Sequence, residues 1–295
     1  MNFNLAWIGV LLILACAPVA WAGEALKTGD AAWALKTEIF FETGELSKDQ
    51  LQIAIDAYEQ ALQEDPANLT LHIKLMDALY YMGFYIAKKK SEKKPYAVRA
   101  IELNQSALQV LSDRIGREKL AAAKTPEAQA ELFKQVPQAA AVHLWCGINW
   151  GIWSQAHSSL AAARHNVGRK IRDHSAMVML LDDQFWDGGG YRLMGRLHTY
   201  APIVPGFTGW VDRAYGISMI RKANAISTQD TRNPMFLAEA ILKFEPQNEN
   251  EAIEILEELS SRQPRGNRPA EAAHYINKAQ RLLNVVKRHR VQEKR

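Results

Sequence analysis

Residues 182–202, DDQFWDGGGYRLMGRLHTYAP, form the segment around which we expect the rest of the chain to be arranged. Three consecutive glycines, Gly188, Gly189 and Gly190, separate an acidic and aromatic approach from a run over residues 191–200 that reads as a helix. Glycine tolerates backbone angles that other residues resist, so the sequence predicts a sharp structural turn at these three positions. The Ala-Pro dipeptide that closes the segment ends the helix, because proline cannot continue its hydrogen-bond ladder.

Two arginines on the helix after this turn, Arg192 and Arg196, lie one helical turn apart and share a face. Such a stripe suits a carboxylate ligand, an acidic partner or ion pairs within the protein, and internal or surface pairing is the default expectation. The glycines lack the Lys-Ser/Thr ending of a phosphate loop and the spacing of a dinucleotide fingerprint. The three nearby aspartates also lack calcium-loop spacing, so we interpret them as cap and turn residues.

The segment VHLWCGINWGIWSQAHSSLAAA, residues 142–163, predicts one aromatic helix that is buried in the fold. Trp150 and Trp153 are three positions apart and share a face, with Trp145 close to it. Tryptophan side chains can line an apolar pocket or simply fill a core, and both readings stay open. As candidate ligand-binding residues we take the aromatic and basic side chains of this helix and of residues 186–196, namely Trp145, Trp150, Trp153, Trp186, Tyr191, Arg192 and Arg196.

Earlier in the chain, the segment AIDAYEQALQEDPAN, residues 54–68, has the spacing of the second helix of a tetratricopeptide (TPR) repeat. Its small residues let neighbouring helices approach, Tyr58 fills the remaining gap and Pro66 ends the helix. A second, degenerate repeat follows in LTLHIKLMDALYYMGFY and AVRAIELNQSALQVL, and we expect the basic run KKKSEKKP, residues 88–95, to be the loop that interrupts it.

Strong helix formers dominate the whole chain, and no stretch alternates as a strand does. Gly, Pro, Asn and Asp clusters punctuate it every 12–22 residues or so, as expected for paired helices. The sequence therefore predicts an all-α fold, an irregular TPR-like helical-repeat solenoid of antiparallel helix pairs. We assign residues 23–286 to this domain and residues 287–295 to a basic C-terminal tail.

The N-terminus contains no charged residue from position 5 to position 22, and Ala20-Trp21-Ala22 fits a small-x-small cleavage site. This pattern predicts a secretory signal peptide over residues 1–22. Two alternatives stay open, namely lipidation at Cys16, which follows a lipobox-like Ile-Leu-Ala, and an uncleaved membrane anchor. All three export the remainder of the chain.

The composition excludes several classes of protein. The chain has 295 residues, 48% of them hydrophobic and 23% charged, with a net charge of +4, which is ordinary for a folded domain and does not indicate nucleic-acid binding. Cys16 and Cys146 are the two cysteines, so no disulfide framework is expected. No zinc-type Cys/His spacing, nucleophile elbow or other catalytic motif occurs. We therefore expect no metal, no cofactor and no enzymatic activity.

In combination, these features resemble the T component of TRAP transporters, a family of periplasmic TPR-containing accessory proteins. The most specific part of the resemblance is FWDGGGYRLMGRLHTYAP, residues 185–202, supported by NWGIWSQAHSS, residues 149–159, and by the TPR-like helices. The loop after the Ala-Pro, IVPGFTGWVDRAYG, is more hydrophobic than the resemblance leads us to expect.

The resemblance implies a helical, non-enzymatic periplasmic protein that forms homo-oligomers, binds a substrate-binding protein and shelters or relays a small apolar ligand. On that reading the ligand lies near Trp150, Trp153, Trp186 and Tyr191. The alternative is a TPR scaffold of the cell envelope that grips a protein partner and has no small-molecule ligand.

Overall fold

The computed structural model describes residues 17–204, 206–266 and 268–293, so Cys16 and the proposed lipobox lie outside the described residues. Throughout this part the chain is helical and contains no strand, which confirms the all-α prediction. The helices are α1 (Ala17–Thr43), α2 (Lys48–Glu64), α3 (Leu69–Tyr81), α4 (Lys90–Ile115), α5 (Arg117–Ala122), α6 (Pro126–Phe133), α7 (Ala139–Ala156), α8 (Ser159–Arg164), α9 (Val167–Leu181), α10 (Phe185–Tyr200), α11 (Arg213–Ile226), α12 (Arg232–Phe244), α13 (Glu249–Ser260) and α14 (Pro269–Glu293), with a π-helical turn η1 (Met82–Ile86) and a 3-10 turn η2 (Pro246–Asn248).

The first helix pair shows how the TPR-like sequence produces packing. Ser47 caps α2 by accepting a hydrogen bond from the backbone N–H of Gln50. Ala54 and Ala61 are fully buried, which lets α1 and α2 pack closely along their length. Tyr58 is also buried, and its hydroxyl donates a 2.8 Å hydrogen bond to Asp30 of α1. The small and aromatic positions of the repeat therefore form the contact between the two helices.

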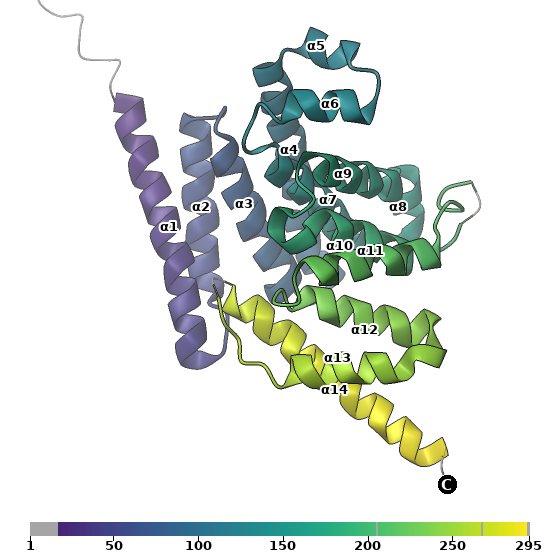
Figure 1. Ribbon diagram of the computed structural model, residues 1–295. Helices are drawn as coiled ribbons and strands as arrows, with labels where there is room; N and C mark the ends of the chain where they lie inside the picture. Colours follow the sequence, from purple (N-terminus) through teal and green to yellow (C-terminus); the bar gives the residue numbers. More distant parts are fainter. Residues whose placement is uncertain (1–16, 205, 267, 294–295) are drawn as a thin grey trace, which may run out of the picture.

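Successive helices pack on their neighbours along the chain, from α1 and α2 through α7, α9, α10 and α11 to α14. The last helix then returns to the first, because α14 contacts α1 (Figure 1). The apolar side chains divide into two clusters, one built from α1 to α10 and the other from α11 to α14. Between these two clusters lies a group of charged side chains, which is described below.

Two of the predicted element boundaries are wrong. The aromatic segment 142–163 is two helices, because α7 ends at Ala156 and the hydroxyl of Ser158 caps α8 by accepting from the N–H of Ala161. The basic run 88–95 is mostly helix, since α4 begins at Lys90. The carboxylate of Glu92 accepts hydrogen bonds from the backbone N–H groups of Lys88 and Lys89. Pro95 lies early in α4, where its missing N–H removes a single helical hydrogen bond.

Among the described residues, no helix combines the length and the apolar character that crossing a membrane requires.

Candidate functional site

The turn predicted at Gly188–Gly190 lies two residues earlier, at Trp186, Asp187 and Gly188. All three have left-handed backbone angles, with φ of 48°, 58° and 75°. For residues other than glycine this conformation costs about 1–2 kcal/mol each, because Cβ crowds the following carbonyl oxygen. The prediction of a sharp turn as such is met, but Gly189 and Gly190 belong to the helix. A strained turn of this kind persists only if its surroundings hold it in place.

Gly189 and Gly190 serve close packing instead. A Cβ atom on Gly190 would lie 2.9 Å from the side chain of Met179 on α9, and one on Gly189 would lie 3.0 Å from Leu144 on α7. Both glycines are buried. The sequence signal for them was correct in residue type, but the physical requirement is space between helices and not backbone freedom.

Arg192 holds the left-handed turn from inside the protein. Its guanidinium donates to the carbonyl oxygens of Trp186 at 3.1 Å and Asp187 at 3.2 Å, and to the side-chain oxygen of Asn233 at 2.9 Å. The amide of Asn233 donates to the same Asp187 carbonyl. Burial and the nearby Arg232 lower the pKa of Arg192 to about 10, which leaves it charged at neutral pH. The buried arginine thus satisfies carbonyl groups that the turn removes from the helical ladder.

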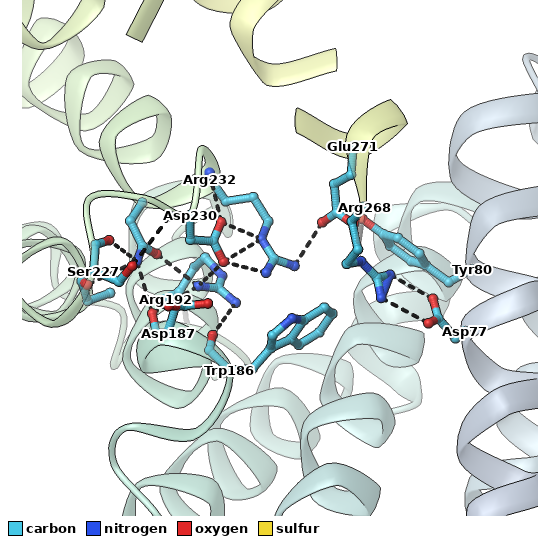
Figure 2. Close-up of polar contacts among 12 residues, drawn as sticks. Asp77, Tyr80, Trp186, Asp187, Arg192, Ser227, Asp230, Arg232, Arg268 and Glu271 are labelled. Atoms are coloured by element: carbon cyan, nitrogen blue, oxygen red, sulfur yellow. Dashed lines mark hydrogen bonds and ion pairs between the residues drawn. The ribbon is translucent and has the colours of Figure 1, made fainter. Parts of the chain in front are cut away.

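From this turn, a chain of ion pairs crosses the seam between the two apolar clusters (Figure 2). Arg192 pairs with Asp230 at 3.1 Å, and Asp230 also pairs with Arg232. Arg232 in turn reaches Glu271 of α14 at 2.8 Å. Although burial favours the neutral acid, Arg192 and Arg232 hold the pKa of Asp230 well below its usual range. The first half of the seam therefore links α10, α12 and α14.

Arg268, directly before α14, completes the connection to α3. It lies 2.6 Å from Glu271 and donates two hydrogen bonds, of 2.9 and 2.7 Å, to the carboxylate of Asp77 on α3. Burial raises the pKa of Asp77 to about 6 in spite of the favourable charge of Arg268. A bidentate arginine–carboxylate pair is geometrically specific, so it fixes how the C-terminal helix sits against α3.

Trp186 provides the apolar partner of these arginines. Its ring lies 4.1 Å from the guanidinium carbon of Arg232 and 4.7 Å from that of Arg268. On another side it contacts Trp145 of α7, with ring centroids 5.4 Å apart. Stacking on an indole stabilises guanidinium groups that have lost part of their hydration. The left-handed turn places the Trp186 ring in this position.

Lys36 of α1 joins the same region without a carboxylate in direct contact. Its ammonium lies 4.0 Å from the ring of Trp33 and 4.5 Å from that of Tyr81, and the side chain is 2% exposed. Burial lowers its pKa to about 8. In the seam as a whole, four cations (Lys36, Arg192, Arg232 and Arg268) face three anions (Asp77, Asp230 and Glu271).

The candidate aromatic residues do not converge on one place. Trp145 and Trp186 belong to the charged seam, whereas Trp150 and Trp153 contact each other farther along α7 at 5.8 Å. Trp150 is covered by the ammonium of Lys170 at 3.8 Å, and Trp153 stacks on His157 at 3.7 Å. All three tryptophans of α7 are buried. The sequence thus identified members of two separate clusters.

The remaining candidates are bound within the chain as well. Arg196 pairs with Glu239 of α12 at 2.8 Å and stacks between Tyr200 and Phe236. Tyr191 is half-buried beside Lys222 of α11, whose ammonium lies 5.6 Å from its ring. The arginine stripe therefore forms internal ion pairs in this structure, as the default reading expected.

Six charged residues of the seam were not singled out from the sequence: Lys36, Asp77, Asp230, Arg232, Arg268 and Glu271. A signal exists for Asp77, because it is the single charge in the apolar run of residues 75–87. The partners of these residues lie up to 191 positions away, and no local pattern encodes that distance.

A second buried polar pair joins α7 to α9. The Nδ1 atoms of His143 and His174 are 3.0 Å apart, and burial lowers their pKa values to about 3 and about 4. Both rings are therefore neutral near pH 7. Within the described part of the chain, no three His, Cys, Asp or Glu side chains are placed to hold a metal ion.

A recess of about 490 Å³ lies on the outer side of α4. Its lining comprises Ser91, Lys94, Pro95, Val98, Arg99 and Glu102, and no tryptophan. Arg99 is paired with Glu59 and Glu102, so the positive charge near the recess comes from the lysines at the start of α4.

Comparison of the chain with models of known protein families and with curated protein sequences gives no match.

Proposed function

We propose that this chain is an exported helical-repeat scaffold that binds a protein partner of the cell envelope, in the setting of a TRAP-type solute transporter. The partner on this proposal is a periplasmic substrate-binding protein, and the scaffold itself is non-enzymatic and assembles as a homo-oligomer. The observation that carries the scaffold role is the return of α14 to α1 and α3 through Arg268 and Asp77. A ring of packed helices held by a buried ion pair presents rigid outer surfaces, which suits protein recognition.

The outer side of α4 is the surface best suited to this partner. Its recess combines Val98, which is 39% exposed, with Lys94 and with Arg99, whose charge is paired with Glu59 and Glu102. The lysines at the start of α4 add positive charge beside it. An apolar side chain next to these lysines fits an acidic protein surface that carries an exposed apolar side chain.

Two hypotheses about the interior of the scaffold are compatible with this proposal, one in which it relays a small ligand and one in which it binds none. A specific observation favours the second. The tryptophans of α7 are at most 8% exposed and are covered by protein side chains. This packing supports a scaffold without a small-molecule ligand, in which the aromatic residues form core. The two versions share the protein partner and differ in what the interior contains.

Capture from periplasmic extract, with native mass spectrometry of the captured complex, tests both versions. We expect a homo-oligomer that retains a substrate-binding protein. Val98→Asp should weaken that complex, whereas Val285→Asp, at a similarly exposed valine of α14, should leave it intact. A small molecule released from the denatured oligomer supports ligand relay, and a ligand-free oligomer supports the pure scaffold. A strict monomer that retains neither partner nor ligand contradicts both.

A further inference from the structure

The described parts of the loop between α10 and α11, residues 201–204 and 206–212, present large apolar side chains to solvent. Ile203 is 56% exposed and Phe207 is 48% exposed. Thr208 links the two parts, because its hydroxyl donates to the Pro202 carbonyl and accepts from the N–H of Val204 at 2.9 Å. Covering such side chains with an apolar surface is favourable in water.

Cationic side chains flank this loop. The indole of Trp210 lies against Gly168 and 4.9 Å from the guanidinium of Arg172, which seats the loop on the first turns of α9. Residues 159–172 contain four basic side chains, Arg164, Arg169, Lys170 and Arg172, and no acidic one. Lys170 covers Trp150 and Arg172 pairs with Asp173, so the cationic character of this surface rests on Arg164 and Arg169, which are exposed. The nearest acids are engaged, because Asp173 pairs with Arg172 and Asp212 caps α11.

From this juxtaposition we infer that residues 201–204 and 206–212, together with the end of α8 and the start of α9, form a docking surface for an anionic lipid membrane. Ile203 and Phe207 enter the boundary between headgroups and acyl chains, and the neighbouring arginines bind lipid phosphates. Apolar insertion and cationic attraction each contribute modestly, and together they give reversible peripheral binding. The inference goes beyond the scaffold role and does not depend on it.

Insertion is measured at single residues with an environment-sensitive fluorophore. Phe207→Cys carries the label, in a chain with Cys16→Ser; the remaining Cys146 is buried. Equimolar phosphatidylglycerol and phosphatidylcholine vesicles should shift the emission of this label to the blue, and pure phosphatidylcholine vesicles should shift it far less. The same label at Phe41→Cys, an exposed site at the end of α1, should not respond to either vesicle.

Charge reversal tests the cationic half. Arg164→Glu with Arg169→Glu should lower binding to the phosphatidylglycerol vesicles at least about tenfold, since each cation near such a surface contributes about fivefold. Lys89→Glu with Lys90→Glu removes the same charge from the start of α4 and should leave binding unchanged. Circular dichroism verifies that both variants are folded.

Three results overturn the inference. One is a label at position 207 that stays in water on anionic vesicles. Another is loss of vesicle binding when Lys89 and Lys90 are replaced, with retention of binding when Arg164 and Arg169 are replaced. The third is an Ile203→Ser, Phe207→Ser double variant that binds vesicles normally but converts an oligomer to monomers, because a second copy of the chain then covers the loop.

Discussion

The guanidinium of Arg268 grips the carboxylate of Asp77 through two hydrogen bonds, of 2.9 and 2.7 Å, across 191 positions of sequence. This pair joins the segment directly before α14 to α3. Both side chains are largely buried, at 19% and 17% exposure, so the pair operates where water screens it poorly.

Removing one member of this pair should be costly. We expect Arg268→Gln to lower the free energy of unfolding by about 3 kcal/mol, because it leaves the buried carboxylates of Asp77 and Glu271 without the cation that they share. Urea denaturation measures the change. Arg117→Gln, which breaks an exposed pair with Asp113, is the matched control and should cost less than about 1 kcal/mol. Equal effects of the two substitutions would show that the ion pair does not stabilise the packing of the C-terminal segment on α3.

Asp187 allows the backbone strain of the left-handed turn to be tested separately from packing, because its side chain is exposed. At φ 58° and ψ 45°, Asp187→Val should destabilise the fold by about 1–2 kcal/mol, since a branched Cβ resists these angles. Asp187→Gly should be neutral or should stabilise it by up to about 1 kcal/mol. Thermal unfolding compares the stabilities of the two variants. If the valine variant were the more stable, residue 187 would not have left-handed backbone angles.

Gly190 tests the close approach of α10 to α9. We expect Gly190→Ala to destabilise the protein by about 1–3 kcal/mol, because the added Cβ would overlap the side chain of Met179. Gly151→Ala on α7 meets nothing within 4 Å and should stabilise its helix by about 0.5–1 kcal/mol. Opposite signs of the two changes in denaturation midpoint support the packing interpretation. Gly189→Val should likewise impair folding or assembly.

The His143–His174 pair predicts a stability that falls in acid. Their folded pKa values, about 3 and about 4, lie below the value of 6.5 expected when unfolded. The unfolded chain therefore binds more protons, so their contribution is complete above pH 6.5 and declines as the pH falls toward 4. The slope is at most about 1.4 kcal/mol per pH unit for each histidine.

Urea titrations from pH 7 to pH 4.5 measure this slope, with His143→Phe as the comparison. Asp77 contributes in the opposite sense, because its raised pKa makes the folded state bind more protons between about pH 4 and pH 6. That contribution is common to both proteins and cancels in their difference. If His143→Phe left the slope unchanged, the loss of stability in acid would not come from the His143–His174 pair.

Much of the helical architecture could be predicted from the sequence, because caps and helix-ending residues act on their close neighbours in the chain. The helix end predicted at Pro66 is confirmed, because α2 ends at Glu64 and Asn68 caps α3, and such caps act over a single turn. The same holds for the first TPR-like pair, where Ala54, Tyr58 and Ala61 are buried as their spacing required. The errors arose where local signals compete. Ser158 acts as a cap inside an aromatic run, and Pro95 stands within a helix.

What the tertiary structure decided is the identity of the partners. From the sequence alone, Gly188–Gly190 indicated a turn, but the need for space beside Met179 and Leu144 became visible only when α7 and α9 were in place. Likewise, Arg192 was a candidate ligand-binding residue with ion pairing as the default expectation. Its role in holding the Trp186 and Asp187 carbonyls depends on left-handed backbone angles that residues other than glycine disfavour. Helix formation depends on neighbours within about four residues, which a sequence displays. The charged seam depends on contacts between segments as far apart as Asp77 and Arg268, and those exist only after the helices have packed.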